Sequence, residues 1–250
     1  MTEEARVPKR RRGIYLLPNL FTTAALFAGF YAIVAAIGGR FEAAGIAIFV
    51  AQLMDGLDGR VARLTNTQSD FGVEYDSLSD MVAFGIAPAL VVYVWSLSNL
   101  GKLGWLAAFV YTAAAALRLA RFNTQTANAD RAYFQGLPSP PAAALIAGLV
   151  WLCSENGIQG ADLSLLAFAL TLTAGLLMVS NVRYQSFKDL DFKGKVPFVS
   201  VLLLVLVFVF ISIEPPIILF GMTAVYAASG PILTLSQLRK RRAEKKLAGK

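Results

Sequence analysis

Four aspartates lie close together in the segment MDGLDGRVARLTNTQSDFGVEYDSLSD, residues 54–80. Asp55 and Asp58 are three positions apart and Asp76 and Asp80 are four apart, so each pair shares one face of a helix. Hard divalent cations such as Mg²⁺ and Mn²⁺ take carboxylate oxygens as ligands. The four carboxylates therefore predict a site for one or two such ions, and two ions can clamp a diphosphate and stabilise charge on a leaving phosphate oxygen.

The composition leaves few other groups for chemistry. The chain of 250 residues contains no histidine, so imidazole is not available as a base, an acid or a metal ligand. The single Cys153 excludes an internal disulfide, a thiolate metal cage and CxxC redox chemistry. Any reaction must therefore use carboxylates, hydroxyls, amides and the Lys and Arg side chains.

The elements that must position the aspartates are membrane helices. Hydrophobic residues make up 56% of the chain and charged ones 16%, whereas soluble domains carry roughly 25% charged residues. The apolar residues fall into runs long enough to cross a bilayer. We expect an all-α integral membrane protein with about eight transmembrane helices, near residues 14–38, 41–64, 72–97, 103–122, 137–154, 162–181, 196–213 and 215–237. These form one transmembrane catalytic domain over residues 14–237, between basic cytoplasmic tails at 1–13 and 238–250.

The distribution of Lys and Arg predicts the orientation. With both termini in the cytoplasm, 21 of the 23 cationic residues lie on the inner side, and only Arg40 and Lys102 lie outside. This asymmetry is typical of an even number of spans in the inner (cytoplasmic) membrane. The basic residues border membrane spans, so anionic membrane lipids are the expected partners, and no nucleic-acid binding is expected.

The helix pattern also predicts that the aspartates meet at one depth. Counted from Phe41 on the outer side, Asp55 lies about 21 Å along its helix, or about 9 Å from the inner boundary of the hydrocarbon core. Counted from Gly72 on the inner side, Asp76 and Asp80 lie about 6 and 12 Å deep. Two antiparallel helices joined on the cytoplasmic side would thus bring the carboxylates together.

Two other interpretations of the cluster compete with a metal site. The aspartates could be membrane-boundary charges that cap helices or pair with Arg60 and Arg63. They could also form the permeation site of a cation transporter, which would need further polar groups to continue the path. The outer half offers only four acidic residues, all near expected turns: Glu42, Glu155, Asp162 and Glu214. An enzyme is therefore favoured over a transporter.

The same segment resembles the signature of the CDP-alcohol phosphotransferases, D-x-x-D-G-x-x-A-R-x8-G-x3-D-x3-D. It matches without a gap at eight positions: Asp55, Asp58, Gly59, Ala62, Arg63, Gly72, Asp76 and Asp80. The resemblance implies a membrane-embedded helical bundle with a metal-filled cavity open to the cytosol. It also implies transfer of a phosphatidyl-type group from a CDP-linked lipid to an alcohol, with release of CMP, and a possible homodimer.

The resemblance assigns roles to individual residues. Asp55, Asp58 and Asp76 would hold one metal ion. Asp55, Asp76 and Asp80 would approach a second, with Asp80 also the catalytic base. The CDP-lipid would contact the signature residues Gly59 and Arg63, Ser69 within the same segment, and a Pro-Asn element near the start of the first span: Asn19 and Thr22.

Further blocks are similar to one branch, the membrane-spanning bacterial phosphatidylserine synthases: YLLPNLFTTAALFAGFYAI (15–33), RFN (121–123), YFQGLPSPPAAA (133–144) and MVSNVRYQSFKD (178–189). This branch implies CDP-diacylglycerol as donor and L-serine as acceptor. Sister transferases that use glycerol 3-phosphate, inositol phosphate or choline remain the alternative. Polar residues at the inner ends of the later spans are the candidates for serine binding: Arg118, Arg121, Asn123, Gln135 and Arg183.

Overall fold

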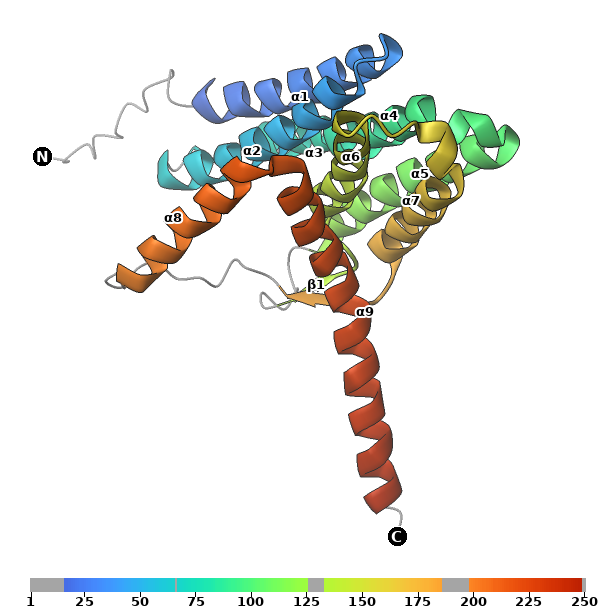
Figure 1. Cartoon of the computed structure of the whole chain (residues 1–250). Helices are drawn as coiled ribbons and strands as arrows, with labels where there is room; N and C mark the ends of the chain where they lie inside the picture. The colour runs from blue at the N-terminus through green and yellow to red at the C-terminus, as the bar shows by residue number, and fades with distance from the viewer. Residues whose placement is uncertain (1–15, 66, 126–132, 186–197, 249–250) are drawn as a thin grey trace, which may run out of the picture.

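A computed structural model describes residues 16–65, 67–125, 133–185 and 198–248. The described chain is helical apart from two short strands (Figure 1). The elements in chain order are α1 (Leu16–Ile37), α2 (Phe41–Thr65), α3 (Asp70–Asp80), η1 (Met81–Ile86), α4 (Ala87–Trp95), η2 (Leu97–Leu100), α5 (Lys102–Gln125), β1 (Tyr133–Gln135), α6 (Ser139–Glu155), η3 (Gly160–Leu163), α7 (Ser164–Val179), β2 (Arg183–Gln185), α8 (Phe198–Ile213) and α9 (Pro215–Ala248).

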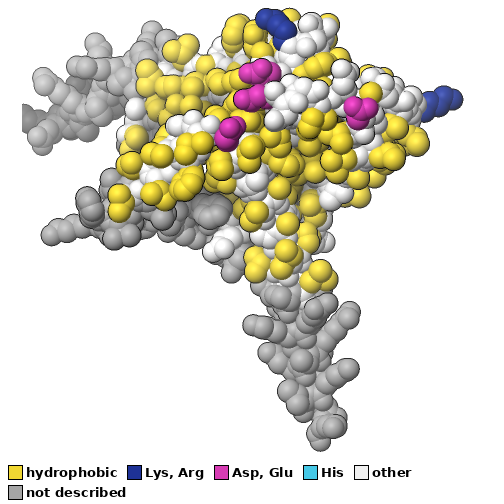
Figure 2. Space-filling view, viewed as in Figure 1, with side chains coloured by type: hydrophobic (Ala, Val, Ile, Leu, Met, Phe, Trp, Pro, Cys, Tyr) yellow, Lys and Arg dark blue, Asp and Glu magenta, His cyan; other side chains and the backbone are white. Residues whose placement is uncertain are grey.

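Several described helices have the length and composition of membrane spans. Five segments qualify: Leu17–Ile37, Asp70–Trp95, Lys102–Thr124, Gly160–Val179 and Pro215–Leu235. The prediction of about eight spans is not confirmed, because α2 carries the first two aspartates and α6 and α8 have only 17 and 16 residues. The face shown in Figure 2 is mostly hydrophobic with few charged side chains. The protein is therefore a multi-pass, mostly helical membrane protein.

Helices α1 and α2 pack side by side through small residues (Figure 1). The turn between them contains Gly39 with φ +73°, a left-handed conformation that favours glycine. On α1, a Cβ added to Gly29 would stand 2.7 Å from the Cα of Ala83, so α1 can approach η1 closely only without a side chain at residue 29. Such small-residue contacts are how helices associate in a bilayer. The buried alanines of this pair are Ala25, Ala28, Ala32, Ala35, Ala36, Ala44, Ala47 and Ala51.

The elements α3, η1 and α4 form one continuous helical rod, the candidate span Asp70–Trp95. It begins at Ser69, whose hydroxyl accepts a hydrogen bond from the Gly72 amide at 3.1 Å. Directly after Asp80 the rod widens into the π-helical turn η1, and the Tyr111 hydroxyl of α5 donates to the Phe84 carbonyl within that turn at 3.0 Å. A π-turn often marks a functional region of a helix.

A two-stranded antiparallel sheet, which was not predicted, joins two connections between helices. Strand β1 precedes α6 and β2 follows α7, with Phe134 opposite Tyr184 and Gln135 opposite Arg183. Each strand has only three residues. The sheet ties the segment before α6 to the segment after α7.

Helix α9 leaves the bundle and runs far beyond it (Figure 1). It begins at Pro215 and Pro216, where the missing amide hydrogens cost nothing, and it contains Pro231 in its interior. The helix continues to Ala248, past the span end expected at residue 237, so most of the expected C-terminal tail is helical. The expected N-terminal tail, residues 1–13, lies outside the described residues.

Candidate active site

Three of the four predicted metal ligands converge. Carboxylate oxygens of Asp55 on α2 and of Asp76 and Asp80 on α3 all lie within 4.8 Å of one another. Asp76 and Asp80 share a face of α3 because they are one helical turn apart. All three side chains are half-buried. Three oxygen donors at this spacing fit a hard divalent cation.

Asp58 lies beside this group and is held by α1. Its side chain is buried, and its carboxylate adjoins that of Asp76. The Thr22 hydroxyl donates a hydrogen bond to Asp58 Oδ2 at 2.8 Å. The sequence resemblance placed Thr22 against the CDP-lipid, whereas in the structure its hydroxyl orients a carboxylate of the cluster. The cluster thus has a hydroxyl donor that the aspartate spacing alone did not reveal.

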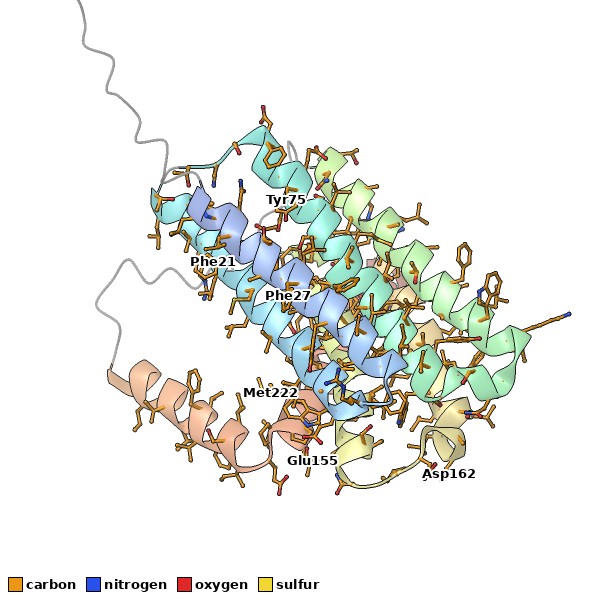
Figure 3. The ribbon with its side chains drawn as sticks, turned by 90° about the horizontal axis from the view of Figure 1, so that it is seen from above. Phe21, Phe27, Tyr75, Glu155, Asp162 and Met222 are labelled. Atoms are coloured by element: carbon orange, nitrogen blue, oxygen red, sulfur yellow. The ribbon has the colours of Figure 1, made fainter. Side chains whose placement is uncertain are left out.

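Two more hydrogen bonds fasten α3 to α1. The Ser79 hydroxyl donates to the Thr22 carbonyl at 3.0 Å, and the hydroxyls of Thr23 and Tyr75 lie 2.9 Å apart. Figure 3 shows Tyr75 on α3 beside α1. These contacts fix the rotation of α3, and with it the direction in which Asp76 and Asp80 face.

The α2 backbone is open next to the aspartates. A Cβ on Gly56 or Gly59 would meet no atom within 4 Å, so both positions leave room for a ligand. Arg63 donates from Nε to the Gly59 carbonyl at 2.9 Å, which directs its guanidinium along this open stretch. Two further residues were expected to contact the lipid. Asn19 lies near the beginning of α3, because its Oδ1 would be 3.6 Å from a Cβ on Gly72. The hydroxyl of Ser69 caps α3.

A cavity of about 1650 Å³ borders the same stretch of α2. One wall is α2 with Gly56, Arg60 and Arg63, and the facing wall is α9. The beginning of α6 and the two strands complete the lining, which is mainly apolar with cationic groups on the α2 side. This combination suits an amphiphile that has an anionic head. The lining residues are Gly56, Arg60, Arg63, Leu64, Phe134, Pro138, Pro141, Gln185, Ile217, Ile218, Gly221, Met222, Thr223, Val225, Tyr226, Ser229 and Leu233.

Arg118 of α5 has a free donor near the cluster. The side chain is only 9% exposed, and its Nη1 donates to the Ser139 hydroxyl at 2.9 Å. Its Nε is buried without a hydrogen-bond partner among the described residues. The guanidinium lies close enough to Asp80 and to Tyr226 of α9 to interact electrostatically with both. A buried donor without a partner is costly unless a ligand satisfies it.

Of the other residues expected to bind serine, Arg121, Asn123 and Gln135 have hydrogen-bond partners within the protein. Arg121 donates to the carbonyls of Gln135 at 2.8 Å, Met178 at 3.2 Å and Val179 at 3.3 Å. It therefore joins β1 to the end of α7.

The remaining candidates are amides and one exposed arginine. Asn123 donates to the Ser77 hydroxyl at 2.9 Å, and Gln135 donates to Asn181 Oδ1 at 2.7 Å. Arg183 is exposed in β2 opposite Gln135. None of these contacts points to a ligand as directly as the buried Nε of Arg118 does.

The α9 wall of the cavity, including Tyr226, was missed in the sequence. Tyr226 lines the cavity and lies near Arg118. In the sequence it is a single tyrosine within an apolar run, which is equally typical of an interfacial aromatic residue. Nothing in the spacing of α9 residues pointed to the cavity.

The acidic residues of the opposite end do not extend the cluster. Figure 3 shows Glu155 and Asp162 together at the end of the bundle away from Tyr75. Glu155 ends α6 and Asp162 lies in η3, so both belong to connections between helices. These two residues are therefore separate from the carboxylate cluster of α2 and α3.

The chain belongs to the CDP-alcohol phosphatidyltransferase family, whose model matches residues 15–180. It is similar to the CDP-diacylglycerol–serine O-phosphatidyltransferase of Helicobacter pylori, at 40% identity over 196 residues, which cover 78% of this chain and 83% of that protein. The protein of the same name from Mycobacterium bovis is 40% identical over 185 residues, with 70% and 63% covered. That of Methanocaldococcus jannaschii is 38% identical over 142 residues, with 57% and 63% covered. The resemblance carried by the aspartate signature is therefore confirmed.

Proposed function

We propose that this protein transfers the phosphatidyl group of CDP-diacylglycerol to the hydroxyl of L-serine, giving phosphatidylserine and CMP. The observation that carries the proposal is the carboxylate cluster of Asp55, Asp76 and Asp80 beside a large apolar cavity edged by arginines. The names of the similar proteins support both substrates. The domain that performs the reaction extends over residues 14–237.

The cluster is the proposed site of two divalent cations, Mg²⁺ or Mn²⁺. Asp55, Asp58 and Asp76 would hold one, and Asp55, Asp76 and Asp80 the other. When bound, the ions supply positive charge for the diphosphate and its leaving oxygen. The hydrogen bond from Thr22 to Asp58 supports this arrangement, because ligating carboxylates are oriented by such donors.

The CDP-lipid would lie with its acyl chains in the cavity and its diphosphate along the open stretch of α2. Gly59 leaves room for it, and Arg63 supplies a charge-assisted contact to phosphate. Asn19 would approach the nucleotide. Thr22 and Ser69 would act indirectly, through Asp58 and through the start of α3.

Serine would enter between the cluster and Arg118. The buried Nε of Arg118 is suited to the serine carboxylate, and Asp80 accepts the proton of the attacking hydroxyl. The new bond joins the serine oxygen to the phosphatidyl phosphorus, and the bond from that phosphorus to CMP breaks in the same step. Arg121, Asn123, Gln135 and Arg183 would shape the entrance.

The distribution of Lys and Arg residues supports the proposed location and orientation of the protein in the cell. With eight spans and both termini cytoplasmic, 21 of 23 Lys and Arg residues lie on the inner side, where anionic lipids gather. We therefore propose a multi-pass protein of the inner membrane whose site faces the cytosol. A homodimer is proposed from the family resemblance alone.

The proposal is tested by a panel of acceptors. Purified protein receives CDP-diacylglycerol with Mn²⁺ or Mg²⁺ and then L-serine, glycerol 3-phosphate, inositol phosphate or choline, and CMP release is measured. We expect release to depend on serine. Faster turnover with another acceptor would assign the protein to a sister branch, and CMP release with no acceptor at all would contradict the transfer.

A further inference from the structure

Tyr184 of β2 inserts into a socket on α9. Its side chain is fully buried. A Cβ placed on Gly230 would overlap the ring, standing 2.6 and 2.7 Å from its two Cε atoms. The ring can therefore lie against the helix backbone only because residue 230 has no side chain.

The hydroxyl of Tyr184 replaces a missing helix hydrogen bond. Within a helix the Ala227 carbonyl would accept from the amide of residue 231, but Pro231 has no amide hydrogen. The Tyr184 hydroxyl donates to that carbonyl at 2.9 Å. Gly230 makes room for the ring and Pro231 leaves an acceptor for its hydroxyl, so the pair forms a socket specific for tyrosine.

A second tyrosine completes the connection in the opposite direction. Tyr226 of α9 donates from its hydroxyl to the Gln185 carbonyl of β2 at 3.2 Å. The rings of Tyr226 and Tyr184 are 5.5 Å apart between centroids and tilted by 44°. Strand and helix are thus joined by two reciprocal hydrogen bonds and one ring contact.

The sheet is anchored to the bundle on its other side. The Gly136 amide donates to the Val182 carbonyl at 2.8 Å, the Leu137 amide donates to the Leu177 carbonyl at 2.9 Å, and Arg121 joins β1 to α7. The sheet is therefore a fixed support, and Tyr184 fastens α9 to it.

The fastened part of α9 is the cavity wall that faces α2. Met222, Tyr226 and Ser229 line the cavity from α9, opposite Arg60 and Arg63. The position of α9 consequently sets the distance between the apolar wall and the arginines.

We propose that Tyr184 is a positioning residue for the CDP-lipid, which acts by seating α9 in the socket of Gly230 and Pro231. The inference rests on the proposed function, in which the cavity holds the lipid. The metal-binding carboxylates lie on α2 and α3, so a shift of α9 changes how the lipid is bound more than it changes the chemical step.

The test combines three variants. Gly230→Ala expels the ring, and we expect the KM for CDP-diacylglycerol to rise about tenfold. Tyr184→Phe leaves the Ala227 carbonyl without a donor, and we expect a rise of about fivefold. In both, kcat and the KM for serine change much less. A general folding defect would instead lower the amount of active protein, and with it the apparent kcat, without a selective rise in the KM for the lipid.

The third variant, Pro231→Ala, tests whether the hydroxyl of Tyr184 acts by occupying the Ala227 carbonyl. The introduced alanine supplies an amide to the Ala227 carbonyl, so Tyr184→Phe should have a smaller effect in this background than in the parent protein. Gly38→Ala, in the turn after α1, is the matched glycine control, because its added Cβ meets no atom nearer than 3.5 Å. Tyr31→Phe, beside Arg40, is the tyrosine control.

Hydrogen–deuterium exchange of α9 supplies a measurement that does not depend on activity. We expect amides around residues 222–230 to exchange faster in Gly230→Ala than in the parent or in Gly38→Ala. Unchanged exchange, or equal effects of Tyr184→Phe in both backgrounds, would overturn the socket. If the parent protein forms no phosphatidylserine but Gly230→Ala loosens α9, the proposed function fails while the socket stands. An active parent whose lipid KM is unchanged in Gly230→Ala would refute the role of Tyr184 in lipid positioning.

Discussion

Asp55 of α2 and Asp76 of α3 are 21 positions apart in the chain, yet their carboxylate oxygens lie within 4.8 Å of each other. Among the described residues, no lysine or arginine forms an ion pair with either of them. Carboxylates gathered inside a membrane protein need protonation, a counter-charge or a bound cation. Their proximity, together with Asp80, is the structural basis for metal dependence.

Removing divalent cations should abolish activity. After dialysis against excess EDTA we expect no serine-dependent CMP release, and we expect recovery on addition of Mn²⁺ or Mg²⁺. Asp55→Asn and Asp76→Asn should be the most damaging single changes, with at least about a hundredfold loss in metal affinity or activity, because each residue would contact both ions. Glu155→Gln, at the opposite end of the bundle, is the control and should behave like the parent protein. Full activity in EDTA would contradict the metal site.

Asp80→Asn should lower kcat while leaving CDP-lipid binding nearly unchanged. The amide cannot accept the serine proton, and general-base assistance is worth about 10²–10⁴ in rate. Its role as base acts in the transition state, and loss of such a role lowers kcat without raising the KM for the lipid; Asn keeps one side-chain oxygen for the metal ion. The kinetic constants, together with equilibrium binding of CDP-diacylglycerol, give the comparison. If the lipid dissociation constant rose enough to account for the whole loss of activity, Asp80 would act in binding only.

The stereochemistry at phosphorus distinguishes direct attack from a covalent intermediate. With a CDP-lipid that is chiral at the phosphatidyl phosphorus, direct attack by serine inverts the configuration. Attack by a carboxylate first, followed by serine, retains it. We expect inversion and no exchange of labelled CMP into CDP-diacylglycerol when serine is absent.

Arg118→Ala should raise the KM for serine more than the KM for the lipid. The change removes the buried Nε donor near Asp80, and a charged hydrogen bond of this kind is worth about 1.5–3 kcal/mol, or roughly tenfold or more in KM. Arg118→Lys should restore little, because an ammonium group does not reproduce the donor geometry of a guanidinium.

Arg121→Ala is the contrasting variant. Its guanidinium donates to three backbone carbonyls, so we expect a lower thermal unfolding temperature rather than a selective change in serine KM. A selective rise in serine KM for Arg121→Ala, with unchanged stability, would return this residue to the serine site.

Thr22→Val should weaken metal binding by about tenfold to a hundredfold, since the hydroxyl that orients Asp58 is lost while the shape of the side chain is kept. The metal concentration for half-maximal activity gives the measurement. Thr112→Val in α5 is the control, because its hydroxyl donates to the Ala108 carbonyl of its own helix at 2.9 Å and has no contact with the cluster. Equal metal requirements in both variants would show that the bond to Asp58 is dispensable.

The aspartate cluster was predictable from the sequence because its geometry is local. Asp76 and Asp80 share a helical face by spacing alone, and the short connection between α2 and α3 brings Asp55 to them. Most helix boundaries follow the apolar runs closely for the same reason. The helix α9 continues past the expected span, through the basic segment to Ala248, whereas its stretch with the composition of a membrane span ends at Leu235.

The rest of the site depends on contacts between segments far apart in the chain, which leave no periodic signal. Strands of three residues carry no alternation that could be recognised, so the sheet and the socket of Tyr184 were not predictable. The role of Arg121 was equally hidden, because a cation at the inner end of a span is typical whether it binds a ligand or caps a helix. The Thr22 contact with Asp58 required the packing of α1 on α2.

The most direct test of the account follows the oxygen of serine. L-Serine labelled with ¹⁸O only at its hydroxyl is incubated with CDP-diacylglycerol, Mn²⁺ and the purified protein, and the products are analysed by mass spectrometry. We expect phosphatidylserine that retains the label in the bond between serine and phosphorus, unlabelled CMP in equal amount, and neither product from Asp55→Asn. Formation of CMP without labelled phosphatidylserine would contradict transfer to the serine hydroxyl.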